Sequence, residues 1–177
     1  MTKTRIKCGI LILCALTFFA GAARAEDGAG RGVGTATGLP LPRFVSLKSD
    51  EVNARVGPGA DYQIAWVFRR AGLPVEVLGE FENWRQIRDS SGSTGWINAA
   101  LTSARRTAVV APWVKDRSLF ELTSSRGGST AVARIEPGAI VDIMHCDGED
   151  CEVYAGSQKG WVPQKNLWGV YPSEKVK

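Results

Sequence analysis

From Arg43 onward, apolar and polar residues alternate in short runs that end at glycine, proline, asparagine or aspartate. Val75-Glu76-Val77 and Val141-Asp142-Ile143 are two such runs, and each follows a glycine turn. A period of two is typical of strands with one buried face, and no stretch of helical length carries the 3.6-residue apolar stripe of a helix. The pattern therefore predicts an all-β protein.

The pattern also repeats along the chain. The two runs lie 66 residues apart, and the triplets Gly95-Trp96-Ile97 and Gly160-Trp161-Val162 match at an offset of 65. The offset of 66 pairs two further apolar positions, Ile87 with Val153 and Leu101 with Leu167. So regular a spacing indicates duplication. We expect two tandem units, over residues 43–105 and 106–177, each a small β-barrel because closure removes exposed sheet edges.

The N-terminus has the pattern of an export signal. Basic residues precede an apolar run over residues 10–20, and Ala23-Arg24-Ala25 has the small-x-small form of a cleavage site. The run is shorter than the ~20 residues of a transmembrane helix. A lipoprotein signal at Cys14 is disfavoured because Leu13 precedes it. We expect a signal peptide over residues 1–25 and a mature protein in the periplasm or secreted.

Residues 26–42 are rich in glycine and end with Pro40 and Pro42, which predicts a flexible linker. The run Gly30-Arg31-Gly32-Val33-Gly34 is not read as a phosphate loop, because no strand precedes it and no helical pattern follows.

Charge excludes a broad class of partners. The chain has 22 basic and 18 acidic residues, but Lys3, Arg5, Lys7 and Arg24 lie in the predicted signal, where there is no acid. The rest is formally neutral, so the field that dominates binding to a phosphate backbone is missing. We expect no nucleic-acid partner and no stable membrane insertion of the mature chain.

Two cysteines remain after the predicted cleavage, Cys146 and Cys151, separated by the turn-like run Asp147-Gly148-Glu149-Asp150. In an oxidising compartment this pair predicts a disulfide that pins the end of a β-hairpin. Zinc is disfavoured because His145 adds only one donor, and the acidic residues lack calcium-loop spacing. We expect no metal and no cofactor.

The first unit contains Val52-Asn53-Ala54-Arg55-Val56-Gly57-Pro58-Gly59, then a central Trp84 and a closing Gly95-Trp96-Ile97. Over Val45 to Leu101 these motifs resemble the bacterial SH3 domain family, with its N-x-R-x-G-P-G opening. The second unit, over residues 107–172, keeps the closing Gly160-Trp161-Val162. It departs at the opening, residues 120–128, and has Asp150 at the central tryptophan position. The resemblance implies SH3-like barrels with a ligand groove.

The opening loop should be stiff, because Pro58 fixes φ and the flanking Gly57 and Gly59 admit positive φ. In SH3-type barrels such a loop forms one wall of the groove. We therefore predict that the groove is lined by Asn53, Arg55, Tyr62, Trp66 and Trp84. Trp84 has an alternative role in packing against the other barrel. Structural roles fall to Gly57, Pro58, Gly59, Gly95, Trp96, Gly160 and Trp161.

Catalysis is not predicted, since both mature cysteines are expected to be oxidised and the chain has one histidine. The resemblance suggests a module that binds an extended peptide, either a cell-wall peptidoglycan peptide or an envelope protein segment. The alternative is a scaffold that assembles with envelope partners, and an accessory of a cell-wall hydrolase is a more remote one. Oligomeric state is not indicated.

Overall fold

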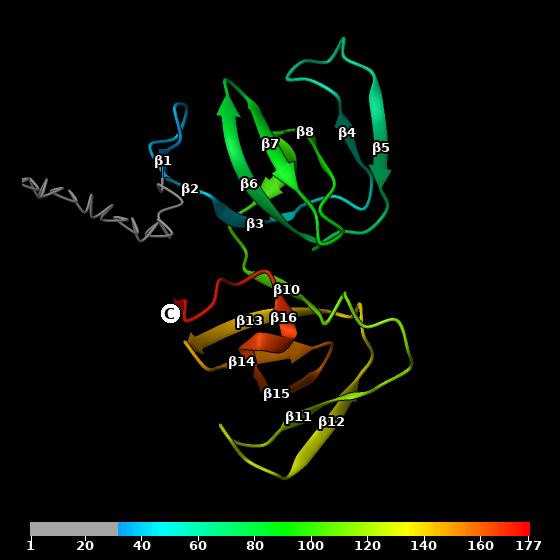
Figure 1. The fold of residues 1–177 in the computed structure, drawn as a ribbon, viewed down its shortest axis with the longest axis vertical. Coiled ribbons are helices and arrows are strands. Elements are labelled where there is room, and N and C mark those ends of the chain that lie inside the picture. The colour runs from blue at the N-terminus through cyan, green and yellow to red at the C-terminus, as the bar shows by residue number, and fades with distance from the viewer. Residues whose placement is uncertain (1–31) are drawn as a thin grey trace, which may run out of the picture.

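A computed structural model describes residues 32–177, so the predicted signal peptide lies outside the described residues. The chain forms two curled sheets, one above the other in Figure 1. The first sheet is built from seven strands: β3 (Arg43–Leu47), β4 (Val52–Arg55), β5 (Ile64–Phe68), β6 (Pro74–Phe81), β7 (Trp84–Arg88), β8 (Thr94–Asn98) and β9 (Thr102–Ser103). The prediction of an all-β fold with two small SH3-like barrels is confirmed.

The second sheet has eight strands: β10 (Thr107–Val110), β11 (Phe120–Thr123), β12 (Ala131–Ile135), β13 (Ile140–Asp147), β14 (Asp150–Ala155), β15 (Gln158–Pro163), β16 (Leu167–Trp168) and β17 (Lys175–Val176). Its order, β12-β11-β15-β14-β13-β10-β16, follows the first sheet's β5-β4-β8-β7-β6-β3-β9 strand for strand. A short 3-10 turn precedes the last strand of this order in each case, η1 (Ala99–Leu101) and η2 (Gln164–Asn166). Each strand of this order in one barrel therefore has a counterpart in the other.

Aliphatic side chains fill both cores. The first is made of Leu47, Val52, Ala54, Phe68, Val75, Val77, Ile87 and Ile97. The second is centred on Val110, Leu122, Val141, Ile143, Val153 and Val162, with both cysteines buried among them. Strands such as β4 and β8 alternate buried and half-buried residues, as the period of two predicts. Within residues 32–177, no helix is both long and apolar enough to cross a bilayer.

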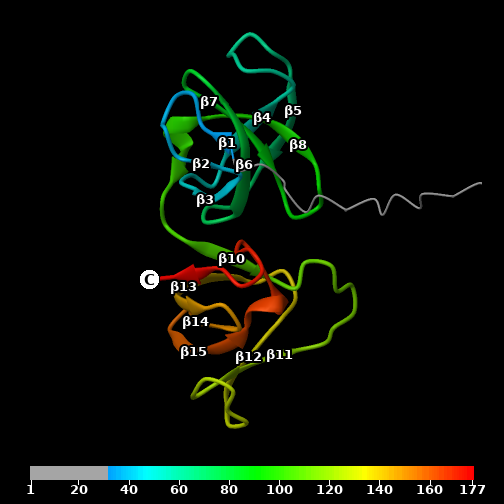
Figure 2. The ribbon, with the colours of Figure 1, turned by 60° about the vertical axis from the view of Figure 1, so that its left-hand side comes forward.

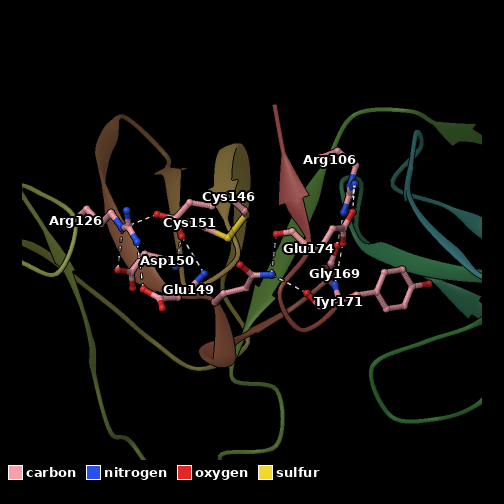
Figure 3. The surroundings of a disulfide bond; sticks show 11 residues. Arg106, Arg126, Cys146, Glu149, Asp150, Cys151, Gly169, Tyr171 and Glu174 are labelled. Atoms are coloured by element: carbon pink, nitrogen blue, oxygen red, sulfur yellow. Dashed lines mark hydrogen bonds and ion pairs between the residues drawn. A yellow bond between two sulfur atoms is a disulfide. The ribbon is translucent and has the colours of Figure 1, made fainter. Parts of the chain in front are cut away.

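The predicted disulfide is present. Cys146 and Cys151 are bonded and lie directly opposite each other at the end of the β13–β14 hairpin (Figure 3). In the turn, the Asp147 carboxylate accepts hydrogen bonds from the backbone N–H groups of Glu149 and Asp150, at 2.9 and 3.0 Å. The strand β17 pairs with β13 beside the bridge and buries Val176 in the second core. The chain's last residues thus cover this end of the barrel.

Residues 32–41, part of the predicted flexible linker, instead form a hairpin of β1 (Gly32–Val33) and β2 (Pro40–Leu41). Its loop folds around the buried carboxylate of Glu80, which accepts hydrogen bonds from the backbone N–H groups of Ala36 and Thr37 at 3.0 and 2.9 Å. The same carboxylate pairs with Arg43 at 2.7 Å and with Arg85 at 3.4 Å. The linker prediction failed here because composition does not reveal a partner 43 residues away.

Burial alone would raise the pKa of Glu80, but hydrogen bonds from Thr37, Arg43 and the backbone of Ala36 outweigh that effect and lower it to about 2. Gly34 makes the contact possible, because a Cβ there would overlap the carboxylate.

In the opening loop of the first barrel, the Tyr62 ring packs against the backbone of the loop. A Cβ on Gly57 would overlap the Tyr62 ring, and one on Gly59 would lie 3.1 Å from it. Neither glycine adopts positive φ, so the sequence-based reason for them was wrong. They are required because the aromatic ring approaches the backbone closely, and this contact stiffens the loop.

Buried polar contacts join the two barrels. The Thr107 hydroxyl, at the start of β10, donates to the Gly72 carbonyl at 2.7 Å and lies 2.7 Å from the Ser46 hydroxyl. The Tyr171 hydroxyl donates to the buried Glu76 carboxylate at 3.0 Å, and Arg88 pairs with the same carboxylate at 2.6 Å. Burial raises the pKa of Tyr171, and the Glu76 charge raises it further. These contacts fix one barrel against the other.

The Glu80 geometry predicts a pH-dependent stability. The folded pKa lies below the ordinary 4.5, so the contribution is fully present above that value and is lost as pH falls toward about 2. The free energy of unfolding of the wild type should fall as the pH is lowered from about 6 to about 3. Over this range we expect Glu80→Gln to lose about 2 kcal/mol less than the wild type does. Chemical denaturation measures this, with the exposed Glu82→Gln as control. Equal pH dependence in wild type and Glu80→Gln would contradict the assignment.

The contact between Gly57 and the Tyr62 ring predicts that the effects of substituting these two residues on stability depend on each other. Gly57→Ala should destabilise the protein by about 1–3 kcal/mol, because the new methyl group overlaps the Tyr62 ring. In a Tyr62→Ala background the same change should cost far less. Urea unfolding of the double-mutant cycle measures the coupling. Gly32→Ala, where a Cβ meets open space, is the matched control, and additive effects of the two substitutions would refute the contact.

Candidate functional site

A row of outward-facing side chains crosses the first barrel. On β8, Trp96 lies opposite Arg55 of β4 on one side and Gln86 of β7 on the other. Residues directly opposite in antiparallel strands share a face, and the flanking Ala54, Ile87 and Ile97 are buried. The side chains of Arg55, Trp96 and Gln86 therefore point away from the core. Trp96 was predicted to be structural, and it lies instead at the centre of an accessible row.

The polar groups of this face are largely uncommitted. Arg55 donates one hydrogen bond, from Nη1 to the Tyr62 carbonyl at 2.5 Å, and no carboxylate of residues 32–177 pairs with it. The side-chain amides of Asn53 and Gln86 make no hydrogen bond within that range. Asn53 shares the outward face of β4 with Arg55, two residues away. The row thus offers a cation, an indole and two free amides to a ligand.

Tyr62 forms the wall of this face. Its ring is half exposed, and Val56 and Ile64, which flank it on the same loop and strand, are also exposed. Because Arg55 bonds to the Tyr62 backbone, the cation and the loop are held together. The predicted groove residues Asn53, Arg55 and Tyr62 are therefore brought to one region.

Trp66 lies elsewhere. Its ring packs against the first core and contacts Phe68 edge to face, with centroids 5.9 Å apart. It also covers Gly95, where a Cβ would come within 2.8 Å of the ring. Gly95 is thus small so that the indole can close the barrel between β5 and β8. In the second barrel Gly160 has a similar role, since a Cβ there would lie 2.9 Å from Leu122.

Trp84 lies at the tip of the β6–β7 hairpin, the end of β6 remote from the second barrel (Figure 1). It pairs with the exposed Phe81 across the hairpin and with Asn98 on β8. The aromatic contacts between the barrels are made by Phe44 with Trp168 and Tyr171, at 5.1 and 4.8 Å between centroids. Trp84 thus extends the outward face along β7, two residues from Gln86.

The missed residues, Trp96 and Gln86, carry a signal in the sequence. Each is next to an isoleucine on its strand, so one residue of each pair must face outward. Their alignment with Arg55 depends on how β4 pairs with β8, which places Arg55 opposite Trp96. That pairing register is not visible in the sequence.

A cavity of about 660 Å³ lies in the second barrel, beside the disulfide hairpin. Apolar walls come from Leu167 and Val170, and Glu149 and Asp150 lie at one side. Gln164 donates from Nε2 to the carbonyls of Tyr171 and Glu174, which leaves its buried Oε1 without a partner in the described chain. No predicted groove residue lines this cavity.

One known protein similar to this chain is named as an amidase. The chain is 28% identical over 126 residues to the "Putative N-acetylmuramoyl-L-alanine amidase YrvJ" of Bacillus subtilis (strain 168), a match that covers 69% of this chain. The matched part is 21% of that protein, so the chain spans about a fifth of the curated relative.

Among solved structures, NlpC2 from Trichomonas vaginalis matches with a TM-score of 0.32 and 13% identity, over 72% of this chain and 48% of that one. NlpC1 of the same organism matches with a TM-score of 0.31 and 13% identity, over 71% and 45%.

The model of the bacterial SH3 domain family matches two segments, residues 48–104 and 125–169. One segment falls in each sheet, and together they cover more than half of the chain. The protein therefore belongs to the bacterial SH3 domain family.

Proposed function

We propose that the protein is an exported, non-catalytic binding module of the cell envelope, with barrels over residues 43–105 and 106–177. Its first barrel recognises an extended peptide that carries a carboxylate. The observation that carries this proposal is the row Arg55–Trp96–Gln86. In it, a cation that pairs with no carboxylate within residues 32–177 adjoins an accessible indole. Half-exposed tryptophan and arginine are typical anchors of binding surfaces.

The chemistry of the face suggests how the ligand would be held. A guanidinium group binds a carboxylate through paired hydrogen bonds. The Trp96 indole offers a flat apolar surface to the adjacent part of the ligand, and the Asn53 and Gln86 amides can bond to its backbone. The stiffness that Tyr62 gives the loop lowers the entropy lost on binding.

A peptidoglycan peptide is the ligand we favour. The relative named as an amidase acts, by its name, on the bond between muramic acid and L-alanine, and cell-wall peptides carry free carboxylates. The disulfide supports a periplasmic or secreted location, since such bonds persist in oxidising compartments. Oxidation of Cys146 and Cys151 also removes the thiols that a cysteine hydrolase would need.

A scaffold role is the second candidate, and one observation favours it. The buried contacts Thr107–Gly72 and Tyr171–Glu76 make the two barrels one rigid body, which suits the assembly of partners at fixed positions.

Sedimentation of the exported protein with isolated cell-wall sacculi tests the proposal. Arg55→Ala and Trp96→Ala should each reduce the apparent affinity about tenfold, since each removes a central contact. The matched controls are Arg117→Ala and Trp113→Ala, which alter exposed residues outside the row. Circular dichroism verifies that each variant is folded.

If both row variants pellet as well as wild type, the Arg55–Trp96–Gln86 row is not the binding site. If the wild-type protein stays in the supernatant but is recovered with proteins from envelope extracts, the scaffold function replaces wall binding.

A further inference from the structure

The second barrel carries the same row with different chemistry. On β15, Trp161 lies opposite Thr123 of β11 and Glu152 of β14, and Glu152 lies opposite His145 of β13. In the first barrel the corresponding chain of pairs is Arg55, Trp96, Gln86 and Gly79. The register shifts also correspond, between Leu122 and Thr123 and between Ile143 and His145. The equivalence follows from the pairing and does not rely on sequence similarity.

The exchanges around the shared tryptophan remove a cation and add a carboxylate. Threonine replaces the arginine, and Glu152 replaces the neutral Gln86. Trp161 keeps a half-buried ring, with Val162 beside it in the core. His145, an exposed residue, meets the Trp161 ring edge to face, with centroids 6.3 Å apart. The first row is therefore cationic, and the second has a carboxylate next to the indole.

An ammonium group from the protein itself already occupies this carboxylate. Lys159 Nζ lies 2.8 Å from the Glu152 carboxylate, and both side chains are partly exposed. Lys159 is two residues from Trp161 on β15, so the two share the outward face. The hydrogen bond to Glu152 raises the pKa of Lys159. The contact shows that an ammonium group fits against Glu152, which lies opposite Trp161.

We propose that the Trp161–Glu152 row of the second barrel binds a primary ammonium group on an extended peptide. The ammonium group of the ligand takes the place of Lys159 on Glu152 and lies against the Trp161 ring. Charge-assisted hydrogen bonding and the attraction of a cation to an indole act together there. Lys159 is a built-in competitor, since an exposed ion pair of this kind is weak enough to be displaced.

This site does not depend on the carboxylate site of the first barrel, because the two rows select opposite charges. The probe for the second row is the peptide acetyl-Ala-Lys-Ala-amide, whose one charge is an ammonium group. Its counterpart with an acetylated lysine side chain has no charge and is the matched ligand control.

The experiment follows the tryptophan indole N–H signals of the exported protein by NMR during titration with each peptide. Substitution of Trp161 and Trp96 by phenylalanine assigns their signals. We expect the lysine peptide to shift the Trp161 signal and to leave that of Trp96 unmoved, and the acetylated peptide to shift neither.

Two variants should change the affinity in opposite directions. Glu152→Gln should weaken binding about fivefold, because it removes the charge that holds the ammonium group. Lys159→Ala should strengthen binding about two- to fivefold, because it frees Glu152 from its ion pair. A variant that merely disturbed the fold would not bind more tightly. The controls are Glu121→Gln and Lys115→Ala, which change exposed charges elsewhere in the same barrel.

Three results would overturn the proposal. In the first, the Trp161 signal does not move in either wild type or Lys159→Ala. In the second, the acetylated peptide binds equally well. In the third, the backbone amide signals of Leu167 and Val170, recorded in the same spectra, shift in place of the Trp161 signal, which would put the ligand in the cavity beside the disulfide. Undiminished wall binding by Arg55→Ala bears only on the first barrel, so the two proposals fail separately.

Discussion

The small volume of each barrel is the constraint on which the rest of the structure depends. A sheet of so few short strands encloses room for little more than a layer of aliphatic side chains, and Phe68 is the one aromatic residue in either buried core. None of the six tryptophans is among the buried residues. Their rings must cover a barrel end, as Trp66 does, join the barrels, as Trp168 does, or lie on an outer face, as Trp96 and Trp161 do. The outward-facing tryptophans of the two proposed sites are thus a consequence of a core too small for indoles.

Because each core is small, the hairpin end of each barrel needs further stabilising contacts. The two barrels make these contacts with different chemistry. Glu80 and Arg85 lie opposite each other on β6 and β7, at the positions that Cys146 and Cys151 occupy on β13 and β14. One barrel closes this end with a buried ion pair covered by the N-terminal hairpin, and the other with a disulfide beside the C-terminal strand. A buried carboxylate is stable there only because several donors surround it. The two ends of the described chain are therefore part of the fold, as each covers one of these positions.

Local pattern was sufficient to predict the strands and the disulfide hairpin, because these depend on neighbouring residues. It failed where partners are distant in sequence. The glycines of residues 32–38 suggest a tether, yet Gly34 is there to admit Glu80. Trp66 resembles a groove residue by position, but its ring closes the barrel over Gly95. The alignment of Arg55 with Trp96 depends on the register of β4 against β8, and a shift of one residue reverses which side chains face out. Pairing register across strands was therefore the information that the sequence lacked.

Duplication with a fixed interface has a consequence for recognition. Buried contacts of Thr107 and Glu76 hold the barrels in one arrangement, so the two tryptophan rows keep a constant separation. If both rows carried the same charge, both would bind the same kind of ligand group. Because one row presents Arg55 and the other Glu152, a chain that bears a carboxylate and an ammonium group at the matching spacing would engage both, and the second contact would form at high effective concentration. A chain with only one of these groups would gain from one row alone. If both proposed sites bind, divergence of the second copy adds selectivity for the order and spacing of charges, which two identical copies would not provide.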